Sequence, residues 1–280
     1  MQELEKIEEK LKTLNLKFTA LSTRNSVRIY VETEYQAKKI LENIDLLGLK
    51  REEVIVVVVG KLKPLIEARL LFLQGVRTLK FINPLFKVKK ITGGISTGSL
   101  DYLITGTLAF VNNEYKAISS WHIYLDSKNV VIPGPQDGGT SLEDKVGYVI
   151  DYVDATKGQD ISIADISEIK DKINVEVNNI KGEIVKGVGD ANIGEIVHKY
   201  GRSSALTYAK VIDKNVLVRI EYENIGEVTL KNCYITESFA IAGDSGSLVL
   251  NNNSEAIGLV TAGNNLITVI TSREKLSELI

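Results

Sequence analysis

The sequence predicts a mainly β protein that carries a small α/β unit at its N-terminal end. In the first ~80 residues, apolar residues recur at helical spacing and alternate with short apolar strands. From about residue 84 onward, short β-type segments are separated by glycine, asparagine and aspartate. The spacing of these segments is typical of barrels or a sandwich and not of alternating βαβ units. We therefore expect an α/β domain at residues 1–85 and a β domain at residues 86–280.

Two helices are predicted in the N-terminal unit. Leucine and isoleucine at helical spacing predict the first helix within residues 4–14. A second helix is predicted over residues 33–48, where Thr33 and Gln36 form a capping box and Gly48 supplies the stop signal.

Two strands complete this unit, at residues 26–32 and 52–60. The second, EEVIVVVVG, is a continuous apolar run, which favours a strand buried on both faces over an exposed edge strand. The unit contains no glycine-rich phosphate loop and no histidine, so we expect no chemistry in it.

The β domain is predicted from a series of short strand-like segments that are joined by tight turns such as VNNE and LNNNSEA. A short helix is predicted at the end of the chain, where Leu276 and Ile280 lie four residues apart. Strands are predicted within residues 101–125, 144–153, 159–169, 214–237, 246–263 and 266–272.

Composition excludes several classes of function. The chain has 280 residues, of which 44% are hydrophobic and 25% charged, and its 34 basic and 36 acidic residues give a net charge of −2. No overall positive field recruits nucleic acid or acidic lipid. The first residues lack the apolar core of a secretion signal, and no later stretch is long enough to span a bilayer. We expect an intracellular protein that binds neither nucleic acid nor membrane, and no intramolecular disulfide because Cys233 is the single cysteine.

The candidate chemical groups lie in three separated stretches. His122, one of two histidines, ends the predicted strand YKAISSWH, whereas His198 lies in a turn-like region. Asp160 stands at the entrance of an apolar strand, where a buried acid needs a partner such as an imidazole N–H. Ser245 lies between Gly243 and Gly246 in AGDSGSLVL, where a sharp turn lets the serine oxygen and successive amides face one point. Each stretch also has an ordinary structural interpretation, as a core histidine, a strand-initiating aspartate or a turn serine.

Taken together, the three stretches resemble the chymotrypsin-like (trypsin-like) serine peptidases, especially their disulfide-free microbial members. SSWH resembles the strand of the catalytic histidine, QDISIADI the strand opened by the catalytic aspartate, and GDSGS the nucleophile loop. The order is also that of the family, and the separation in residue number is 38 from His122 to Asp160 and 85 from Asp160 to Ser245. The resemblance runs from about residue 92 to the end. It implies a double β-barrel, with barrels at about 92–185 and 186–280, and a C-terminal helix.

The resemblance also implies a reaction. Ser245 attacks a peptide carbonyl, His122 takes and returns the proton, and Asp160 fixes the imidazole tautomer. The backbone N–H groups of Gly243 and Ser245 form the oxyanion hole. The substrate is a polypeptide, and no metal or cofactor is implied.

Substrate recognition is assigned by the same resemblance. Thr261, Ala262 and Gly263 lie along the substrate backbone as a strand-like edge. Phe239 occupies the position that forms the floor of the specificity pocket in the family, and a phenylalanine there disfavours a preference for lysine or arginine. Three alternatives stay open for Phe239: it shapes an apolar or shallow pocket, it fills the pocket, or it is a core residue. By resemblance to related microbial enzymes, His198 and Arg202 are expected to border the specificity pocket.

Two questions have more than one answer from the sequence: whether a cut near residue 90 activates the protein, and whether the protein is catalytic. If residues 1–90 are a prodomain, cleavage after Lys90 exposes Ile91, whose ammonium pairs with Asp244. The alternative, which we favour, is that ITGGIS is a first strand and its turn, with Asp244 satisfied by neighbouring amides. The sequence SSWHI departs from the family's usual small alanines and cysteine around the histidine. A catalytically silent binding module and a protease that cleaves only itself therefore remain alternatives, and the sequence names no partner for the N-terminal unit.

Overall fold

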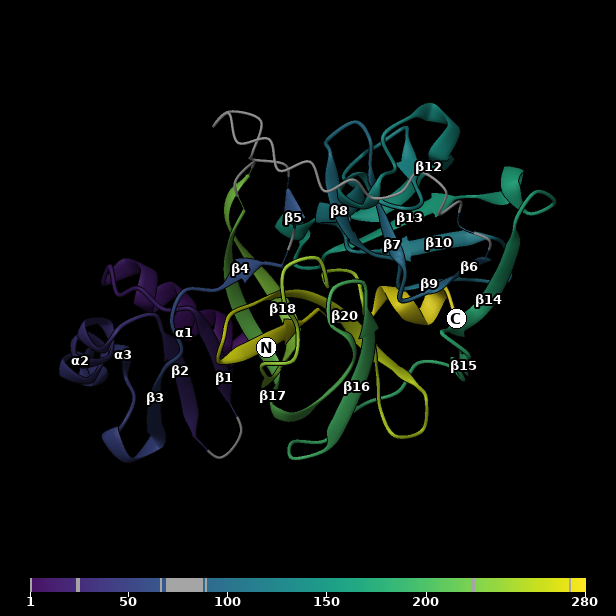
Figure 1. The fold of residues 1–280 in the computed structure, drawn as a ribbon. Helices are drawn as coiled ribbons and strands as arrows, with labels where there is room; N and C mark the ends of the chain where they lie inside the picture. The colour runs from purple at the N-terminus through teal and green to yellow at the C-terminus, as the bar shows by residue number, and fades with distance from the viewer. Residues whose placement is uncertain are drawn as a thin grey trace.

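The computed structural model describes residues 2–23, 26–65, 67–68, 88, 90–222, 225–271 and 273–280. Strands dominate the described residues, so the mainly β class is confirmed. Figure 1 shows the β-rich body, with the N-terminal helices at one side of it. The expected domain boundary after residue 85 falls outside the described residues.

The N-terminal unit packs helices on one face of three strands. Apolar residues of α1, α2 and α3 form a core with β2 and β3, and this core includes Leu217 from the body of the protein. The elements are α1 (Gln2–Thr13), β1 (Ala20–Thr23), β2 (Val27–Val31), α2 (Glu34–Glu42), α3 (Ile44–Leu47), the 3₁₀ helix η1 (Arg51–Glu53) and β3 (Val54–Val58).

The capping box of the second predicted helix is confirmed, but the single helix over 33–48 is wrong. Thr33 Oγ1 accepts from the Gln36 amide at 3.3 Å, and Gln36 Oε1 accepts from the Thr33 amide at 3.1 Å. The helix breaks at Asn43, whose side-chain amide donates to the Lys39 carbonyl and so competes with the helical ladder. Gly48 then ends α3 in a left-handed conformation with φ 73°.

The prediction that the run at 52–60 is buried on both faces is also wrong. β3 pairs in parallel with β2 and ends its sheet, and Ile55 is 45% exposed. Val56 and Val58 pack against the helical core and Val57 packs against the core of the ring. The apolar run therefore belongs to an edge strand that contacts a core on each side and is only partly buried.

A ring of strands forms the C-terminal half of the body. Its order is β16–β19–β20–β21–β18–β17, and a further pairing between β16 and β17 closes it. The strands are β16 (Ile196–Gly201), β17 (Ala205–Tyr222), β18 (Gly226–Glu237), β19 (Leu248–Leu250), β20 (Ala256–Gly263) and β21 (Ile267–Ile270). His198 therefore lies in a strand and not in the expected turn.

A second, eight-stranded sheet precedes the ring in the sequence, in the order β5–β8–β7–β11–β12–β13–β10–β9. Its strands are β5 (Glu67–Ala68), β7 (Ser96–Ser99), β8 (Ile104–Thr107), β9 (Phe110–Val111), β10 (Lys116–Ser119), β11 (Val130–Val131), β12 (Lys145–Val153) and β13 (Ile161–Asp165). A small sheet joins β6 (Lys90–Gly93), β14 (Asn174–Ile180) and β15 (Glu183–Ile184). The remaining elements are β4 (Lys63–Pro64), α4 (Trp121–Tyr124) and the 3₁₀ helices η3 (Pro135–Asp137), η4 (Leu142–Asp144), η5 (Ala155–Lys157), η6 (Ser167–Ile169) and, as the predicted closing helix, η7 (Lys275–Glu278).

The N-terminal unit is continuous with the ring. β1 pairs antiparallel with β17, so β1, β2 and β3 extend the same sheet. Neighbouring residues of β17 serve the two sides of this sheet: Leu217 enters the helical core, whereas Val216 and Val218 enter the core of the ring. Cys233 lies in that ring core, and burial, together with the charge of Asp160, raises the pKa of its thiol. Among the described residues, no helix has the length and apolar character needed to cross a membrane.

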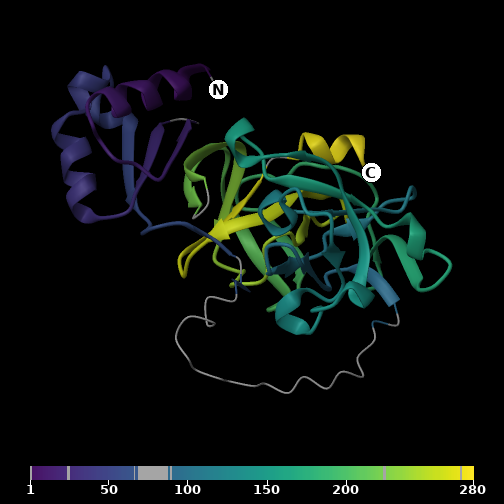
Figure 2. The same cartoon turned by 90° about the horizontal axis from the view of Figure 1, so that it is seen from above.

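The chain crosses from the N-terminal unit to the body after β3 (Figure 2). Asn264 holds this crossing, because its side-chain amide donates to the carbonyls of Val59 at 2.7 Å and Lys61 at 3.2 Å. β4 follows and pairs with β20.

Asp213 of β17 links the N-terminal strands to the ring. Its buried carboxylate accepts hydrogen bonds from Ser22 and from Tyr30, the latter at 2.7 Å, and lies 3.5 Å from the Arg28 guanidinium. Replacing Asp213→Ala leaves both hydroxyls without this acceptor, and we expect a loss of about 2 kcal/mol in the free energy of unfolding, measured by urea denaturation. Asp171→Ala, at an exposed site, is the control; equal losses for the two variants contradict the assigned role.

Candidate active site

The pairing of β10 with β13 brings two predicted site residues to one place. The strands are antiparallel, with Lys116 opposite Asp165 and Ser119 opposite Ser162. The residues that follow β10 therefore meet those that precede β13. His122 comes three residues after β10 and Asp160 one residue before β13, so this register places them side by side.

Asp160 is fully buried and receives several hydrogen bonds. Its Oδ1 accepts from the His122 backbone N–H at 3.0 Å, and its Oδ2 lies 2.6 Å from His122 Nδ1. The hydroxyls of Thr261 and, at 3.4 Å, Tyr222 also donate to Oδ2. Burial opposes ionisation of Asp160, but the charge of His122 and these hydrogen bonds outweigh it and lower the pKa of the carboxyl.

His122 is held from several sides, although it does not end a strand as predicted. It lies in the one-turn helix α4, which follows β10 after Ser120, and its ring centroid is 5.6 Å from that of Tyr222. Nδ1 faces Asp160, which leaves Nε2 as the acceptor nitrogen of a neutral ring. Nε2 is buried and has no hydrogen-bond partner among the described residues.

Ser245 lies in the expected sharp turn, where Gly243 has φ 93° and Gly246 has φ 88°. Its Oγ donates to the Thr261 carbonyl at 3.1 Å. Thr261 thus contacts Asp160 through its side chain and Ser245 through its backbone. Within the described part of the chain, no hydrogen bond joins Ser245 directly to His122.

The backbone amides of the turn converge on one peptide carbonyl. The N–H groups of Gly243 and Ser245 donate to the Leu65 carbonyl at 2.8 Å and 3.4 Å. Two amides that grip one carbonyl oxygen beside a serine side chain have the geometry of an oxyanion hole. Leu65 was not among the residues singled out from the sequence.

The segment before this carbonyl lies along β20. Pro64 pairs with Ala262 and Lys63 with Gly263, in antiparallel register. The Leu65 N–H donates to the Thr261 carbonyl at 3.3 Å. On the other side of Leu65, residue 67 pairs with Thr105 of β8 and residue 68 with Ile104. Thr261, Ala262 and Gly263 thus hold an extended peptide.

Phe239 belongs to the same buried apolar cluster as the Leu65 side chain. Leu65 is buried in an apolar cluster that includes Phe239, Ala240 and Val260. A Cβ built on Gly263 lies 3.4 Å from Leu65 Cδ1, so the small glycine forms part of the same wall. Phe239 therefore contributes to the protein core and lies in the same apolar cluster as the peptide side chain.

Comparison with known proteins identifies this arrangement of strands. No protein-family model and no curated protein sequence matches the chain. Among solved structures, protease A of Thermobifida fusca is 22% identical with a TM-score of 0.51, over 68% of this chain and 95% of that one. A glutamic-acid-specific serine protease is 18% identical, with a TM-score of 0.50 over 67% of this chain and 96% of that one. An alpha-lytic protease homolog, N4, is 16% identical, with a TM-score of 0.50 over 67% and 95%.

The fold is that of the chymotrypsin-like serine proteases. At these identities the likeness establishes the fold alone. The resemblance to chymotrypsin-like serine peptidases that the sequence indicated, and the predicted fold class, are confirmed at the level of the fold.

Asp244, the acid next to Ser245 in this protease fold, is paired to an internal cation. Lys199 Nζ, fully buried, lies 3.2 Å from Asp244 Oδ2. The Ser203, Ser204 and Ile241 amides and the Ser204 hydroxyl also donate to this carboxylate. Burial lowers the pKa of Lys199, while the charge and hydrogen bond of Asp244 oppose that fall.

Ile91 is a strand residue in the uncut chain. It is fully buried in β6, where it pairs in parallel with Val175 of β14. A cut after Lys90 would have to free Ile91 from this strand and displace Lys199 from Asp244. The arrangement fits the alternative that we favour, in which the segment is a first strand and Asp244 is satisfied internally.

His198 and Arg202 are engaged in other pairs. His198 Nε2 lies 2.9 Å from Glu183 Oε2. Arg202 Nη2 donates to Asp137 Oδ1 at 2.7 Å, and a Cβ built on Gly243 would lie 2.4 Å from Arg202 Nη1. Arg202 therefore lies against the turn that carries the two amides.

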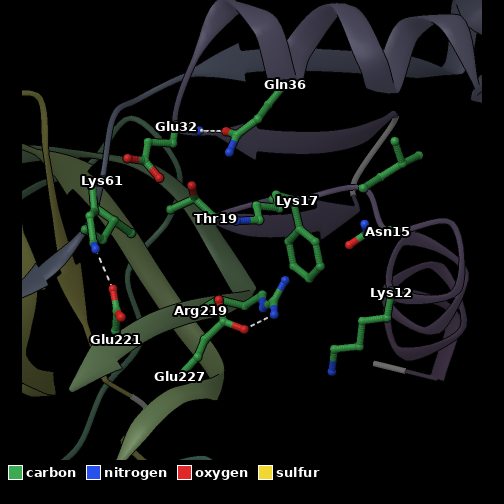
Figure 3. A pocket seen from close by; sticks show the side chains of 13 residues that line it. Lys12, Asn15, Lys17, Thr19, Glu32, Gln36, Lys61, Arg219, Glu221 and Glu227 are labelled. Carbon is green, nitrogen blue, oxygen red and sulfur yellow. Dashed lines mark hydrogen bonds and ion pairs between the residues drawn. The ribbon is translucent and has the colours of Figure 1, made fainter. Parts of the chain in front are cut away.

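A separate pocket of about 450 Å³ opens between the N-terminal unit and β17 (Figure 3). Lys61 forms an ion pair with Glu221 at its rim, and Arg219 pairs with Glu227 and stacks over Phe18 with 4.7 Å to the ring centroid. None of the candidate catalytic residues lines it. Among the described residues, no cluster of three histidine, cysteine or acidic side chains is arranged to hold a metal ion.

Lys116 and Asp165, which lie opposite each other in the β10–β13 register, form an ion pair at 2.7 Å. Burial opposes ionisation of Asp165, but bonds from Lys116 and from the Ser167 amide lower its pKa to about 2. The pKa of Asp165 is lower in the folded protein than in the unfolded chain, where it is about 3.9. The ionised carboxylate therefore stabilises the folded protein above pH 4, and this stabilisation is lost as the pH falls to 2. Since both side chains are about one-fifth exposed, we expect Asp165→Asn to remove about 1–2 kcal/mol of this pH-dependent stability. Urea denaturation between pH 2 and 7 measures it; an unchanged pH profile contradicts the role.

The buried Lys199–Asp244 pair predicts strong coupling. Lys199→Met leaves the Asp244 carboxylate buried without its cation, and we expect a loss of about 3 kcal/mol in the free energy of unfolding. The double variant Lys199→Met/Asp244→Asn removes both charges and should recover part of that loss, whereas Lys210→Met at an exposed position should change little. Additive effects of the two single changes in denaturation experiments would exclude the coupling.

Proposed function

We propose that this chain is a serine endopeptidase in which Ser245, His122 and Asp160 hydrolyse peptide bonds through an acyl-enzyme. One observation carries the proposal: the amides of Gly243 and Ser245 grip a peptide carbonyl next to the Ser245 side chain. The buried His122–Asp160 pair supports it, because Nε2 is the ring nitrogen left to accept a proton. The likeness of the fold to serine proteases is in accord with it.

Each group has a defined task in the proposed reaction. Ser245 Oγ leaves its hydrogen bond to Thr261 by rotation of the side chain and attacks the carbonyl carbon while His122 Nε2 takes the proton. Asp160 holds the Nδ1–H tautomer and stabilises the imidazolium that forms. The two amides stabilise the oxyanion, and each such donor typically lowers the barrier by about 3 kcal/mol.

A catalytically silent binding module on the same fold is the second candidate. The hydrogen bond of Ser245 to the Thr261 carbonyl favours it, because the hydroxyl is directed to a backbone acceptor and not to the base. A silent module would still bind extended peptides along β20, and would leave the serine unreactive.

Labelling with a fluorophosphonate, which reacts with activated serines, separates the two candidates. We expect one adduct on Ser245, located by peptide mass spectrometry, and a fall of ~10⁴-fold in labelling rate for Asp160→Asn, since the imidazole is then held in the wrong tautomer. Ser238→Ala, at an exposed serine, is the matched control and should label like the parent.

Because residues 63–65 lie on the site, the labelling is repeated on Leu65→Asp, whose charged side chain does not suit the apolar pocket. Absence of a Ser245 adduct in both folded proteins, with circular dichroism unchanged, favours the silent module.

A further inference from the structure

The chain places its own backbone on the proposed site. Lys63 and Pro64 add a short strand to β20, the Leu65 N–H bonds to the Thr261 carbonyl, and the Leu65 carbonyl accepts from two amides. The Leu65 side chain is buried in the apolar cluster that includes Phe239. Backbone, carbonyl and side chain of this residue are thus all held in the way an extended substrate is held.

We propose that the peptide bond between Leu65 and Ile66 is the first substrate of this site and is cleaved within the same molecule. The inference rests on the proposed function. It adds to that function the bond that is cut, the side chain that the pocket accepts, and a role for the N-terminal unit as a covalently attached inhibitor.

The hydrogen bonds mark which bond is cut. Oxyanion-hole donors bind the oxygen of the carbonyl that is attacked, so the donors on Leu65 assign the bond that follows it. The backbone is also held beyond this bond, because residues 67 and 68 pair with Thr105 and Ile104 of β8. The described backbone is thus paired on both sides of Leu65, through residues 63–64 and 67–68.

Attachment within the molecule favours cleavage in cis. The Val59 amide donates to the Val31 carbonyl at 2.8 Å, and Asn264 binds the carbonyls of Val59 and Lys61 just before the segment. Leu62 is buried in the core of the ring, and the Lys61–Glu221 ion pair visible in Figure 3 lies beside it. The segment therefore reaches the site at a high effective concentration that does not depend on a second molecule.

The surroundings of Leu65 indicate the class of substrate. Leu65 is buried in an apolar cluster that includes Phe239, Ala240 and Val260, so a leucine or methionine suits this place, whereas a carboxylate would lose its hydration there. Lys63, by contrast, is exposed. We expect the site to select extended peptides with an unbranched or γ-branched apolar residue before the cut.

The reaction balances with water as the only co-reactant. A bond forms from Ser245 Oγ to the Leu65 carbonyl carbon, and the Oγ proton passes to His122 Nε2. The carbon–nitrogen bond to Ile66 breaks, and that nitrogen leaves as an amine with the proton from Nε2. Water then adds to the acyl carbon while His122 Nε2 takes one of its protons, and the bond from Oγ to that carbon breaks as Nε2 passes this proton to Oγ. Leu65 is released as a carboxylic acid, which loses its proton to solvent.

The cut pieces are expected to stay together at first. The N-terminal piece keeps β1 paired with β17, and its buried contacts through Asp213 do not involve the cut bond. The new Leu65 carboxylate also remains beside the two amides that bound the carbonyl. Cleavage alone therefore yields a nicked protein that migrates as one particle until the strands separate.

The test uses the full chain and follows intact mass and new N-terminal sequence over time. We expect one cut, with a new terminus at Ile66, at a rate unchanged by tenfold dilution and absent in Ser245→Ala. Leu65→Asp should slow the cut by about 100-fold or more, while Leu65→Met, a volume-conserving control, should stay near the parent rate. Native gel filtration should show one peak, and denaturing electrophoresis two bands.

Several outcomes would overturn self-cleavage. Some of them retain the proposed endopeptidase function, and one rejects both. A chain that stays whole while its Leu65→Asp form cleaves an added peptide KLKPLIEA overturns self-cleavage and retains the endopeptidase. A new terminus at Ile91, or cleavage that persists in Ser245→Ala, also overturns it. Absence of both Ser245 labelling and peptide cleavage in folded Leu65→Asp rejects the endopeptidase, and with it this inference.

Discussion

A carboxylate without solvent contact is the constraint on which the rest of the site depends. Removing Asp160 from water costs several kcal/mol unless donors replace the lost hydration. Those donors come from Thr261 on β20 and Tyr222 on β17, two strands of the ring, and from His122 on α4, which follows β10 of the eight-stranded sheet. Satisfying one charge therefore fixes the eight-stranded sheet against the ring. The same contacts orient the imidazole and place the Thr261 carbonyl where both Ser245 and Leu65 donate to it.

The edge of β20 explains why the chain lies on its own site. β19 covers one side of β20 only as far as Leu259, and the backbone of Thr261, Ala262 and Gly263 continues beyond it. An uncovered strand edge invites pairing with other chains. β4 covers this edge through Ala262 and Gly263, so the pairing that protects the fold is the pairing that presents a peptide to the amides of the turn. In the proposed self-cleavage, inhibition and presentation of a substrate are then one structural arrangement.

The sequence predicted the parts of the fold and site that depend on local patterns. The α1 periodicity, the Thr33–Gln36 capping box and the glycines around Ser245 are short-range signals, and the structure contains each of them. The break at Asn43 follows from a local bond of its side chain to the Lys39 carbonyl, whereas the helical turn at His122 and the edge position of β3 depend on contacts that no local pattern encodes. Leu65 was missed for the same reason: KLKPLIEA reads as an ordinary linker, and only its register against β20 distinguishes it. A leucine after a proline between two domains is at most a weak signal.

The internal Lys199–Asp244 pair bears on whether the turn that carries Ser245 is organised before or after a first cut of the chain. In the activation route suggested by the sequence, a new ammonium at Ile91 organises the turn next to Ser245. Here Lys199 already occupies that position against Asp244, and the amides of Gly243 and Ser245 already converge on a carbonyl in the uncut chain. A turn that is organised before any cut needs no earlier cleavage to become competent. In the proposed self-cleavage, the first cut then depends on rotation of the Ser245 side chain away from the Thr261 carbonyl, and not on assembly of the donors that stabilise the oxyanion.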